Sequence, residues 1–199
     1  MLQKLAYFIL HLFGWTMVGH RPPEKKYMAI GYPHTANLDG LWVVLTILAM
    51  GERPKVFVKS TLVRFPVKRL LLAIGCIPIV RGKGVRDLVQ QSVEYIDTVE
   101  TIALMLSPEG SRSYTEYWKS GFYYIALAAD IPIYFCYLNY ETNHLGINDE
   151  PLYLTGDMGK DMQVIRDFYA DKVSKRPERV GPIRLKGETM LSPPTDVAE

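Results

Sequence analysis

The stretch YMAIGYPHTANLDGLWVVLTILAM, residues 27–50, indicates the fold more clearly than any other part of the chain. Its first six residues form a compact apolar run, which is typical of a buried strand. Its last ten residues form a longer apolar run, which predicts a buried helix. Between the two runs lies a polar loop that contains His34 and Asp39. Such a loop is a usual place for chemistry in α/β proteins, because it holds functional residues on a rigid scaffold.

His34 and Asp39 are separated by four residues, and no other residue of this stretch carries charge near neutral pH. A histidine within reach of a carboxylate is a common general base, because the carboxylate fixes the tautomer of the ring and stabilises the imidazolium. The loop contains no Ser or Cys, which argues against a covalent nucleophile on this segment. The alternative is an ordinary loop histidine beside a residue that caps the following helix.

Apolar runs and helical spacing predict that strands and helices alternate along the rest of the chain. We expect strands at 56–58, 77–80, 102–106 and 132–138, helices at 64–74, 85–99, 121–129 and 162–173, and an edge strand at 152–154. The fold class predicted from this alternation is α/β. We expect a single domain with a mixed, mostly parallel β-sheet that is flanked by helices.

Charged residues follow several of the predicted strands. The carboxyl ends of parallel strands meet at one edge of a sheet, so we expect these residues to lie near His34: they are Lys59, Arg81, Glu109 and Arg112. The cations favour an anionic substrate, and planar guanidinium groups suit the oxygens of a phosphate. Gly110 would let the backbone approach a ligand closely. The alternatives are a solvated basic face and an ion pair between Arg112 and Glu109 within their own loop.

The composition is that of a globular protein. The 199 residues carry a formal net charge of +2 and 48% of them are hydrophobic, so we expect one domain without a charged tail and without a nucleic-acid partner. Residues 52–86 contain nine Lys or Arg and one acidic residue, which indicates a bound anion, an anionic surface or a solvated basic face. Cys76 and Cys136 lack a CxxC partner, so we predict two reduced thiols and no metal site.

The N-terminal residues 5–19 are almost entirely apolar. A helix of this length would be about 22 Å long, shorter than the ~30 Å hydrocarbon core of a bilayer, so we do not predict a spanning segment. We expect residues 1–20 to form a helix at the membrane interface, with a helix packed on the domain as the alternative. Residues 21–190 would form the catalytic domain and residues 191–199 a disordered tail.

Four short motifs occur in order between residues 27 and 138. They are His34-x4-Asp39, a glycine-to-arginine motif at 75–81, SPEGSRS at 107–113 and Ile-Pro-Ile at 131–133. With these motifs the chain resembles the lysophospholipid acyltransferase family, which includes the 1-acylglycerol-3-phosphate acyltransferases, and it looks most like a compact bacterial branch. Pro33, Ala36 and Ser107 depart from the residues that are common in the family. The ordered set of four motifs is far more specific than His-x4-Asp by itself.

The resemblance implies transfer of a fatty acyl group from a thioester to the hydroxyl of a lysophospholipid or glycerol-phosphate acceptor. His34 would be the general base, Asp39 would hold its ring, and Arg81, Glu109 and Arg112 would hold the acceptor headgroup. We expect Lys59 and Gly110 to contribute to this substrate site as well. Acyl-CoA or an acyl carrier protein would supply the acyl group as a substrate, without a further cofactor.

We expect the protein to lie at the cytoplasmic face of the cell membrane as a peripheral or monotopic protein. Its partners would be the acyl donor, the acceptor and the membrane surface, with acyl carrier protein as one form of the donor. Three other functions compete with this interpretation. They are an acyltransferase for a different lipid or glycolipid acceptor, a lipid-phosphate binding protein without turnover, and a hydrolase that directs water at the thioester.

Overall fold

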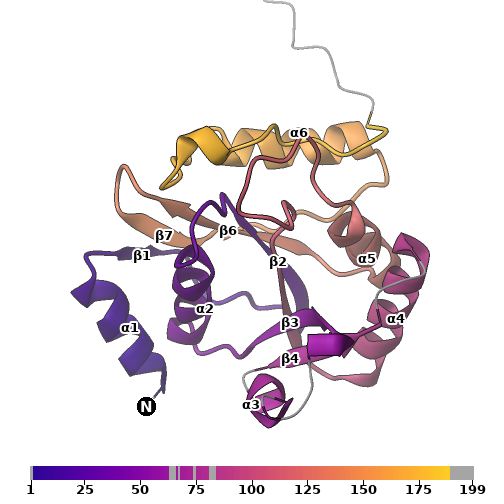
Figure 1. The fold of residues 1–199 in the computed structure, drawn as a ribbon, viewed down its shortest axis with the longest axis horizontal. Coiled ribbons are helices and arrows are strands. Elements are labelled where there is room, and N and C mark those ends of the chain that lie inside the picture. The colour runs from indigo at the N-terminus through magenta and orange to yellow at the C-terminus, as the bar shows by residue number, and fades with distance from the viewer. Residues whose placement is uncertain (1, 63–65, 67, 74, 81–83, 189–199) are drawn as a thin grey trace, which may run out of the picture.

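A seven-stranded sheet forms the centre of the protein, and its middle strand is the one that precedes His34 (Figure 1). The computed structural model describes residues 2–62, 66, 68–73, 75–80 and 84–188. The strand order is β1-β7-β6-β2-β5-β3-β4. The strands are β1 (Thr16–Val18), β2 (Lys26–Tyr32), β3 (Pro54–Lys59), β4 (Cys76–Ile79), β5 (Ile102–Leu106), β6 (Ile133–Asn139) and β7 (His144–Ile147).

Among the described strands every neighbouring pair is parallel except β6 and β7. The sheet is therefore mixed and mostly parallel, which confirms the predicted fold class. β2 pairs with β5 on one side and with β6 on the other. Because both faces of a central parallel strand are covered, its sequence is an almost continuous apolar run.

Helices cover both faces of the sheet (Figure 1). Alternate residues of β2 point to opposite faces, so Ala29 joins one core and Ile30 joins the other. The first core lies under α1 (Leu2–Leu12) and α2 (Asp39–Ala49). The second core lies under α4 (Val85–Thr98), α5 (Gly121–Ala129) and α6 (Met158–Tyr169). Three short helices complete the described chain: η1 (Ser60–Leu62), α3 (Lys68–Ala73) and η2 (Pro177–Arg179).

The elements nearest the motifs agree closely with prediction. β5 and α5 have the predicted bounds, 102–106 and 121–129, and β2 begins one residue before residue 27. α2 begins at Asp39 rather than at residue 41. Asp39 is therefore the first residue of the helix, and its position is fixed by both the loop and the helix.

The N-terminal segment differs from prediction. The helix ends at Leu12 instead of continuing to residue 19, and Gly14 follows with φ +78°, a left-handed conformation that glycine adopts readily. Residues 16–18 instead form β1, which pairs in parallel with β7. The prediction of one helix for residues 1–20 is thus wrong in its second half. None of the described helices is long and apolar enough to span a membrane.

Three other predicted elements need correction or lie outside the described residues. Leu152 makes only an isolated bridge with Ile133, so the described part of 152–154 contains no strand. The late helix spans 158–169 rather than 162–173, and the Asp157 side chain caps it by accepting the Lys160 N–H at 3.2 Å. Of the helix predicted at 64–74, the structure describes 68–73 as helical. The predicted tail, 191–199, lies outside the described residues.

Candidate active site

His34 lies in the loop between β2 and α2, at the carboxyl edge of the sheet. Its side chain is 22% exposed, so the ring is partly buried and still reachable. It lines a cavity of about 360 Å³ whose other walls are almost entirely apolar. They are formed by Gly31, Pro33, Gly40, Val43, Val44, Val56, Phe57, Met105, Leu106, Ser107 and Leu138. A reactive group that enters this apolar cavity can therefore meet His34.

Asp39 lies beneath the same loop and is 1% exposed. Its Oδ2 atom accepts the backbone N–H groups of Thr35 and Ala36, each at 2.7 Å. Its Oδ1 atom accepts the hydroxyl of Tyr140 at 2.6 Å. Three donors thus compensate for burial of the carboxylate and hold it in one place.

The structure brings His34 and Asp39 together without a direct hydrogen bond between them. His34 Nδ1 lies 3.9 Å from Asp39 Oδ2, which is beyond hydrogen-bonding distance. The pair is still close enough for the carboxylate to favour the protonated ring. Because Nδ1 faces Asp39, Nε2 is the ring nitrogen that remains available to contact a substrate. Catalytic hydrogen bonds are often long in the absence of substrate and shorten in the complex.

The pKa of His34 is lowered from its ordinary value of 6.5. Burial is the largest cause, because it disfavours the charged ring, and the positive charge of Arg112 acts in the same direction. Asp39 opposes both effects. The neutral ring, which is the form that accepts a proton, is therefore favoured at neutral pH.

Glu109 follows β5 and is 2% exposed. Its Oε2 atom accepts the backbone N–H of His34 at 2.7 Å. Burial raises the pKa of Glu109 to about 7, the His34 N–H opposes this shift, and the nearby Asp39 reinforces it. Sequence reasoning expects Glu109 to hold a substrate headgroup, whereas the structure turns its carboxylate towards the loop of His34. Among the ion pairs between described residues, none joins Glu109 to Arg112.

The other predicted site residues occupy the same edge where they are described. Arg112 is exposed and near enough to His34 to affect its pKa. Lys59 is the last residue of β3, the strand beside β5. Gly110 has φ +62°, and a Cβ there would lie 3.1 Å from Lys119 Cγ, so the position suits glycine in both conformation and space. Arg81 lies outside the described residues.

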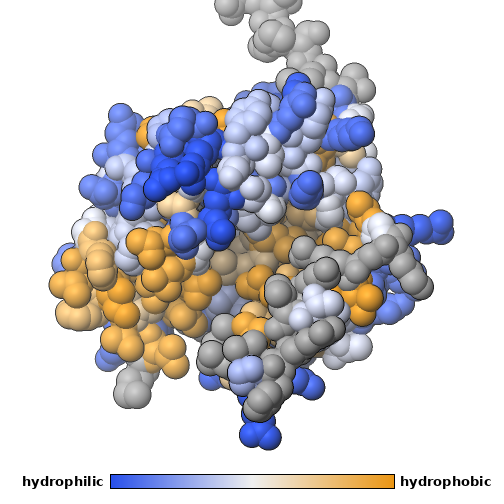
Figure 2. Space-filling view, in the orientation of Figure 1, coloured by the Kyte–Doolittle hydropathy of each residue, from blue (hydrophilic) through white to orange (hydrophobic). Residues whose placement is uncertain are grey.

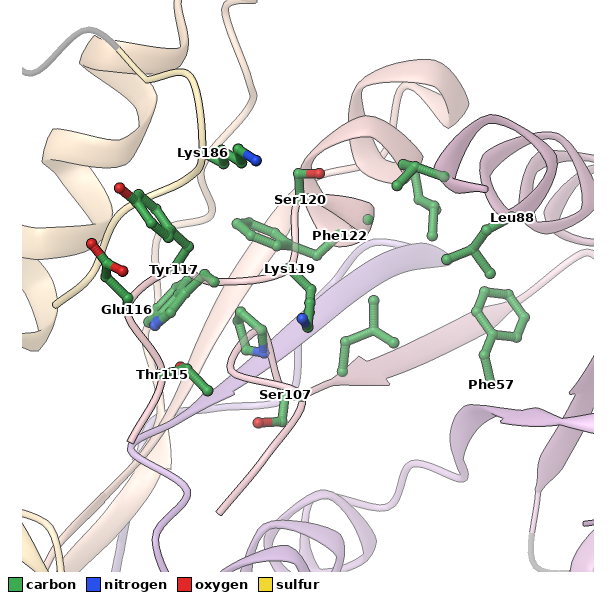
Figure 3. Close-up of a pocket in the computed structure, with 17 residues that line it drawn as sticks. Phe57, Leu88, Ser107, Thr115, Glu116, Tyr117, Lys119, Ser120, Phe122 and Lys186 are labelled. Atoms are coloured by element: carbon green, nitrogen blue, oxygen red, sulfur yellow. The ribbon is translucent and has the colours of Figure 1, made fainter. Parts of the chain in front are cut away.

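A second cavity, of about 740 Å³, adjoins the first. The two cavities share Phe57, Leu106 and Ser107 as walls. Figure 3 shows Phe57 and Leu88 at one end of the second cavity, and Glu116, Tyr117 and Lys186 at the other. Both volumes lie in the range of small-molecule sites.

Sequence reasoning misses two groups that contact the His34 loop from far along the chain. Tyr140, just after β6, donates to Asp39. The segment around η2 reaches Thr35: the Arg176 N–H donates to its Oγ1 at 3.3 Å, and Arg179 Nη1 donates to its carbonyl oxygen at 3.4 Å. These contacts join residues more than 100 positions apart, so no local sequence pattern predicts them. Among the described residues there is no group of three His, Cys, Asp or Glu placed to hold a metal ion.

The mostly parallel sheet defines an α/β protein. The partly buried histidine beside a buried aspartate, directly after the central strand, is a candidate general base at an apolar cavity. The family named Acyltransferase matches residues 20–139, which is more than half of the chain and includes His34, Asp39, Glu109 and Arg112. The chain therefore belongs to the acyltransferase family. This confirms the resemblance seen in its motifs.

The fold is similar to that of a solved acyltransferase, the 1-acyl-sn-glycerophosphate (LPA) acyltransferase PlsC from Thermotoga maritima. The two have a TM-score of 0.55 and 13% sequence identity, over 87% of this chain and 80% of that one. At this identity the likeness establishes a shared fold. Among curated proteins, none matches this chain significantly in sequence.

Proposed function

We propose that this protein transfers a fatty acyl group from a thioester to the hydroxyl of a lysophospholipid or glycerol-phosphate acceptor. The observation that carries the proposal is the position of His34, a partly exposed histidine beside a buried carboxylate in the lining of an apolar cavity. Membership of the acyltransferase family supports the reaction class. The acceptor class is supported by the shared fold with a protein described as a 1-acyl-sn-glycerophosphate acyltransferase.

In the proposed reaction His34 Nε2 takes the proton of the acceptor hydroxyl as its oxygen attacks the thioester carbonyl. A C–O bond forms, the C–S bond breaks, and the imidazolium returns the proton to the departing thiolate. Asp39 stabilises the imidazolium through the Nδ1 side of the ring. Glu109 holds the backbone of His34, and we assign it a positioning role.

We propose that the cavity beside His34 takes part of an acyl chain. Its walls include Val43, Val44, Val56 and Met105, which offer no polar group to a chain passing between them. The thioester carbonyl would then lie beside His34, which is part of the same lining. The adjoining larger cavity gives room for a further part of the donor or acceptor.

We propose that Arg112 binds the acceptor phosphate, together with Arg81 and Lys59. Arg112 is exposed at the site and its charge reaches His34. In Arg112→Ala we expect kcat/KM for a phosphorylated acceptor to fall about ten- to hundredfold, because a hydrogen bond to a charged group contributes roughly 1.5–3 kcal/mol. The donor KM and the melting temperature should stay close to wild type. A parallel loss of donor affinity and stability would show a structural role instead.

We further propose peripheral attachment to the cytoplasmic face of the membrane. Ala6 and Leu10 of α1 are buried towards α2, whereas the outer side of α1 exposes Leu5, Phe8 and Leu12. Figure 2 shows hydrophobic side chains gathered over α1 and α2, next to a strongly hydrophilic region. A large exposed apolar surface on a helix suits the interface of a bilayer.

The reaction can be tested with the purified protein, acyl-CoA or acyl carrier protein loaded with the same labelled chain, and a panel of lipid hydroxyl acceptors. We expect acyl release to depend on an acceptor and to yield an ester detectable by mass spectrometry. Release to water without an acceptor would indicate a hydrolase. Tight binding of a lysolipid without release would indicate a binding protein. Comparison of the two donors identifies the thioester that the protein uses.

A further inference from the structure

The two oxygens of Asp39 have different partners. Oδ2 accepts two loop N–H groups and is the oxygen nearest to His34, while Oδ1 accepts the hydroxyl of Tyr140 at 2.6 Å. The terminal torsion of an aspartate has a broad energy profile, so the plane of a carboxylate is fixed only when both oxygens are held. Tyr140 is the side chain that holds the second oxygen.

Tyr140 is itself held by several parts of the chain. Its backbone N–H donates to the carbonyl of Val173 at 2.9 Å. Its ring packs edge-on against Trp15, with ring centroids 5.0 Å apart, and Lys175 Nζ lies 5.9 Å from the ring centre. Residues that precede β1, follow β6 and follow α6 therefore converge here. These contacts orient the Tyr140 hydroxyl towards Asp39.

The hydroxyl of Tyr140 acts as a donor over the whole physiological range. Burial raises the pKa of Tyr140 above its ordinary value, and the hydrogen bond to Asp39 and the charge of Asp39 raise it further. A protonated phenol and an ionised carboxylate form a charge-assisted hydrogen bond. The other titratable groups near this cluster are Lys175 over the tyrosine ring, Arg179 on the carbonyl of Thr35, and Arg112 and Glu109 around His34.

We propose that Tyr140 is a positioning residue for the reaction, and that its hydroxyl holds Asp39 so that Oδ2 stays turned towards His34 Nδ1. This orientation keeps the proton of the neutral ring on Nδ1 and leaves Nε2 free to act as the base. The inference rests on the proposed function for its effect on turnover. Its effect on the tautomer of His34 is independent of any activity.

The test compares Tyr140→Phe with Tyr134→Phe. Tyr134 lies at the other end of β6, and its buried ring carries a hydroxyl that donates to the carboxylate of Glu24, so the control removes the same kind of hydrogen bond away from the site. In Tyr140→Phe we expect kcat to fall about tenfold, which is the effect of one charge-assisted hydrogen bond, with both KM values within twofold of wild type. Tyr134→Phe should keep the kcat of the wild type.

The second readout is the nitrogen NMR spectrum of the histidine rings. The chain has four histidines, so the His34 signals can be assigned by their loss in His34→Ala. We expect the Nδ1–H tautomer of His34 in the wild type and in Tyr134→Phe, and a mixture of tautomers in Tyr140→Phe. In a double-mutant cycle, the variant that carries both Asp39→Asn and Tyr140→Phe should have the same kcat as the single variant Asp39→Asn.

Unchanged kcat with unchanged His34 signals in Tyr140→Phe would overturn the proposal. So would a fall in kcat that is additive with Asp39→Asn, or one that comes with an equal loss of stability and of substrate affinity, because each indicates a structural role. If the wild type transfers no acyl group to any acceptor while Tyr140→Phe still alters the tautomer, the proposed function fails and the coupling of Tyr140 to His34 stands.

Discussion

At the scale of single residues, His34 has the two properties that a general base needs near neutral pH. It is reachable from a cavity, and its surroundings favour the neutral ring. Burial and Arg112 supply this preference, while Asp39 stabilises the imidazolium once it forms. These opposing effects suit the proposed mechanism, in which His34 is neutral before the reaction and carries a positive charge during it.

The direction of the His34 pKa gives a prediction for the pH profile of the reaction. In the proposed mechanism the neutral ring is the active form, so kcat/KM should fall only as the pH drops through a value below 6.5. In Arg112→Ala this acidic limb should move to higher pH, because a cation that disfavours the protonated ring has been removed. The measurement is kcat/KM between pH 5 and 8 for both proteins. An acidic limb above pH 6.5 in the wild type would contradict the assignment.

Glu109 predicts a pH dependence of stability. Its carboxyl keeps its proton in the folded protein up to a pKa of about 7, but would release it near 4.5 when unfolded. Between these two pKa values folding is therefore accompanied by uptake of a proton. The free energy of unfolding falls as the pH rises from 4.5 to 7 and is constant above pH 7. Across that window the contribution of this group is about 3 kcal/mol.

Glu109→Gln removes this ionisation while keeping an oxygen that can accept the His34 N–H. Between pH 5 and pH 8 the wild type should lose about 2.5 kcal/mol of unfolding free energy relative to the variant. Urea denaturation at the two pH values measures the difference. Parallel stability curves for the two proteins would show that Glu109 ionises normally in the folded state.

At the scale of elements, α1 has one buried side and one exposed side. The apolar composition of residues 5–19 does not distinguish them. One side of the helix is buried towards α2, the other is exposed, and the segment after it returns to the sheet as β1. Trp15, between α1 and β1, packs against Tyr140 and Trp42. Removing all of residues 1–19 would thus damage the site as well as the apolar surface, so substitutions on the outer side are the better test.

We predict that Leu5→Ser, Phe8→Ser and Leu12→Ser together abolish sedimentation with vesicles of phosphatidylcholine and phosphatidylglycerol. Each of these side chains is more than half exposed, so the melting temperature should change little. The matched control replaces three exposed apolar residues elsewhere, Leu127, Tyr153 and Val164, by serine and should still sediment. Equal sedimentation of both triple variants would refute attachment through α1. Release of the wild type by salt alone would identify basic residues as the main anchor.

The elements that sequence reasoning locates best are those with long or regular apolar patterns. β5 and α2 are buried over most of their length, and α5 is buried along one face, so burial and pattern agree. β1 and β7 are short and lie at or near the edge of the sheet, where their pairing with each other comes from tertiary contact. Their strand character is therefore absent from the local sequence.

At the scale of the whole molecule, one sheet edge gathers residues from distant parts of the chain. His34 and Asp39 could be predicted because they share one loop, and Glu109 and Arg112 because they follow a recognisable strand. The contact of Glu109 with the backbone N–H of His34 could not be predicted, because a carboxylate after a strand can face a ligand or a neighbouring loop equally well. Tyr140 and the segment around η2 could not be predicted either, because their contacts depend on how β6 and α6 return to the His34 loop.

The measurement that tests the central claim most directly is the rate of acceptor-dependent acyl transfer by His34→Ala. Removing a positioned general base typically costs 10²- to 10⁴-fold in rate, so we expect a loss in that range. His20→Ala, which removes an exposed histidine outside the site, should transfer at the wild-type rate, and both variants should melt as the wild type does. A folded His34→Ala variant that keeps more than about a tenth of the wild-type rate would contradict the claim that His34 is the base.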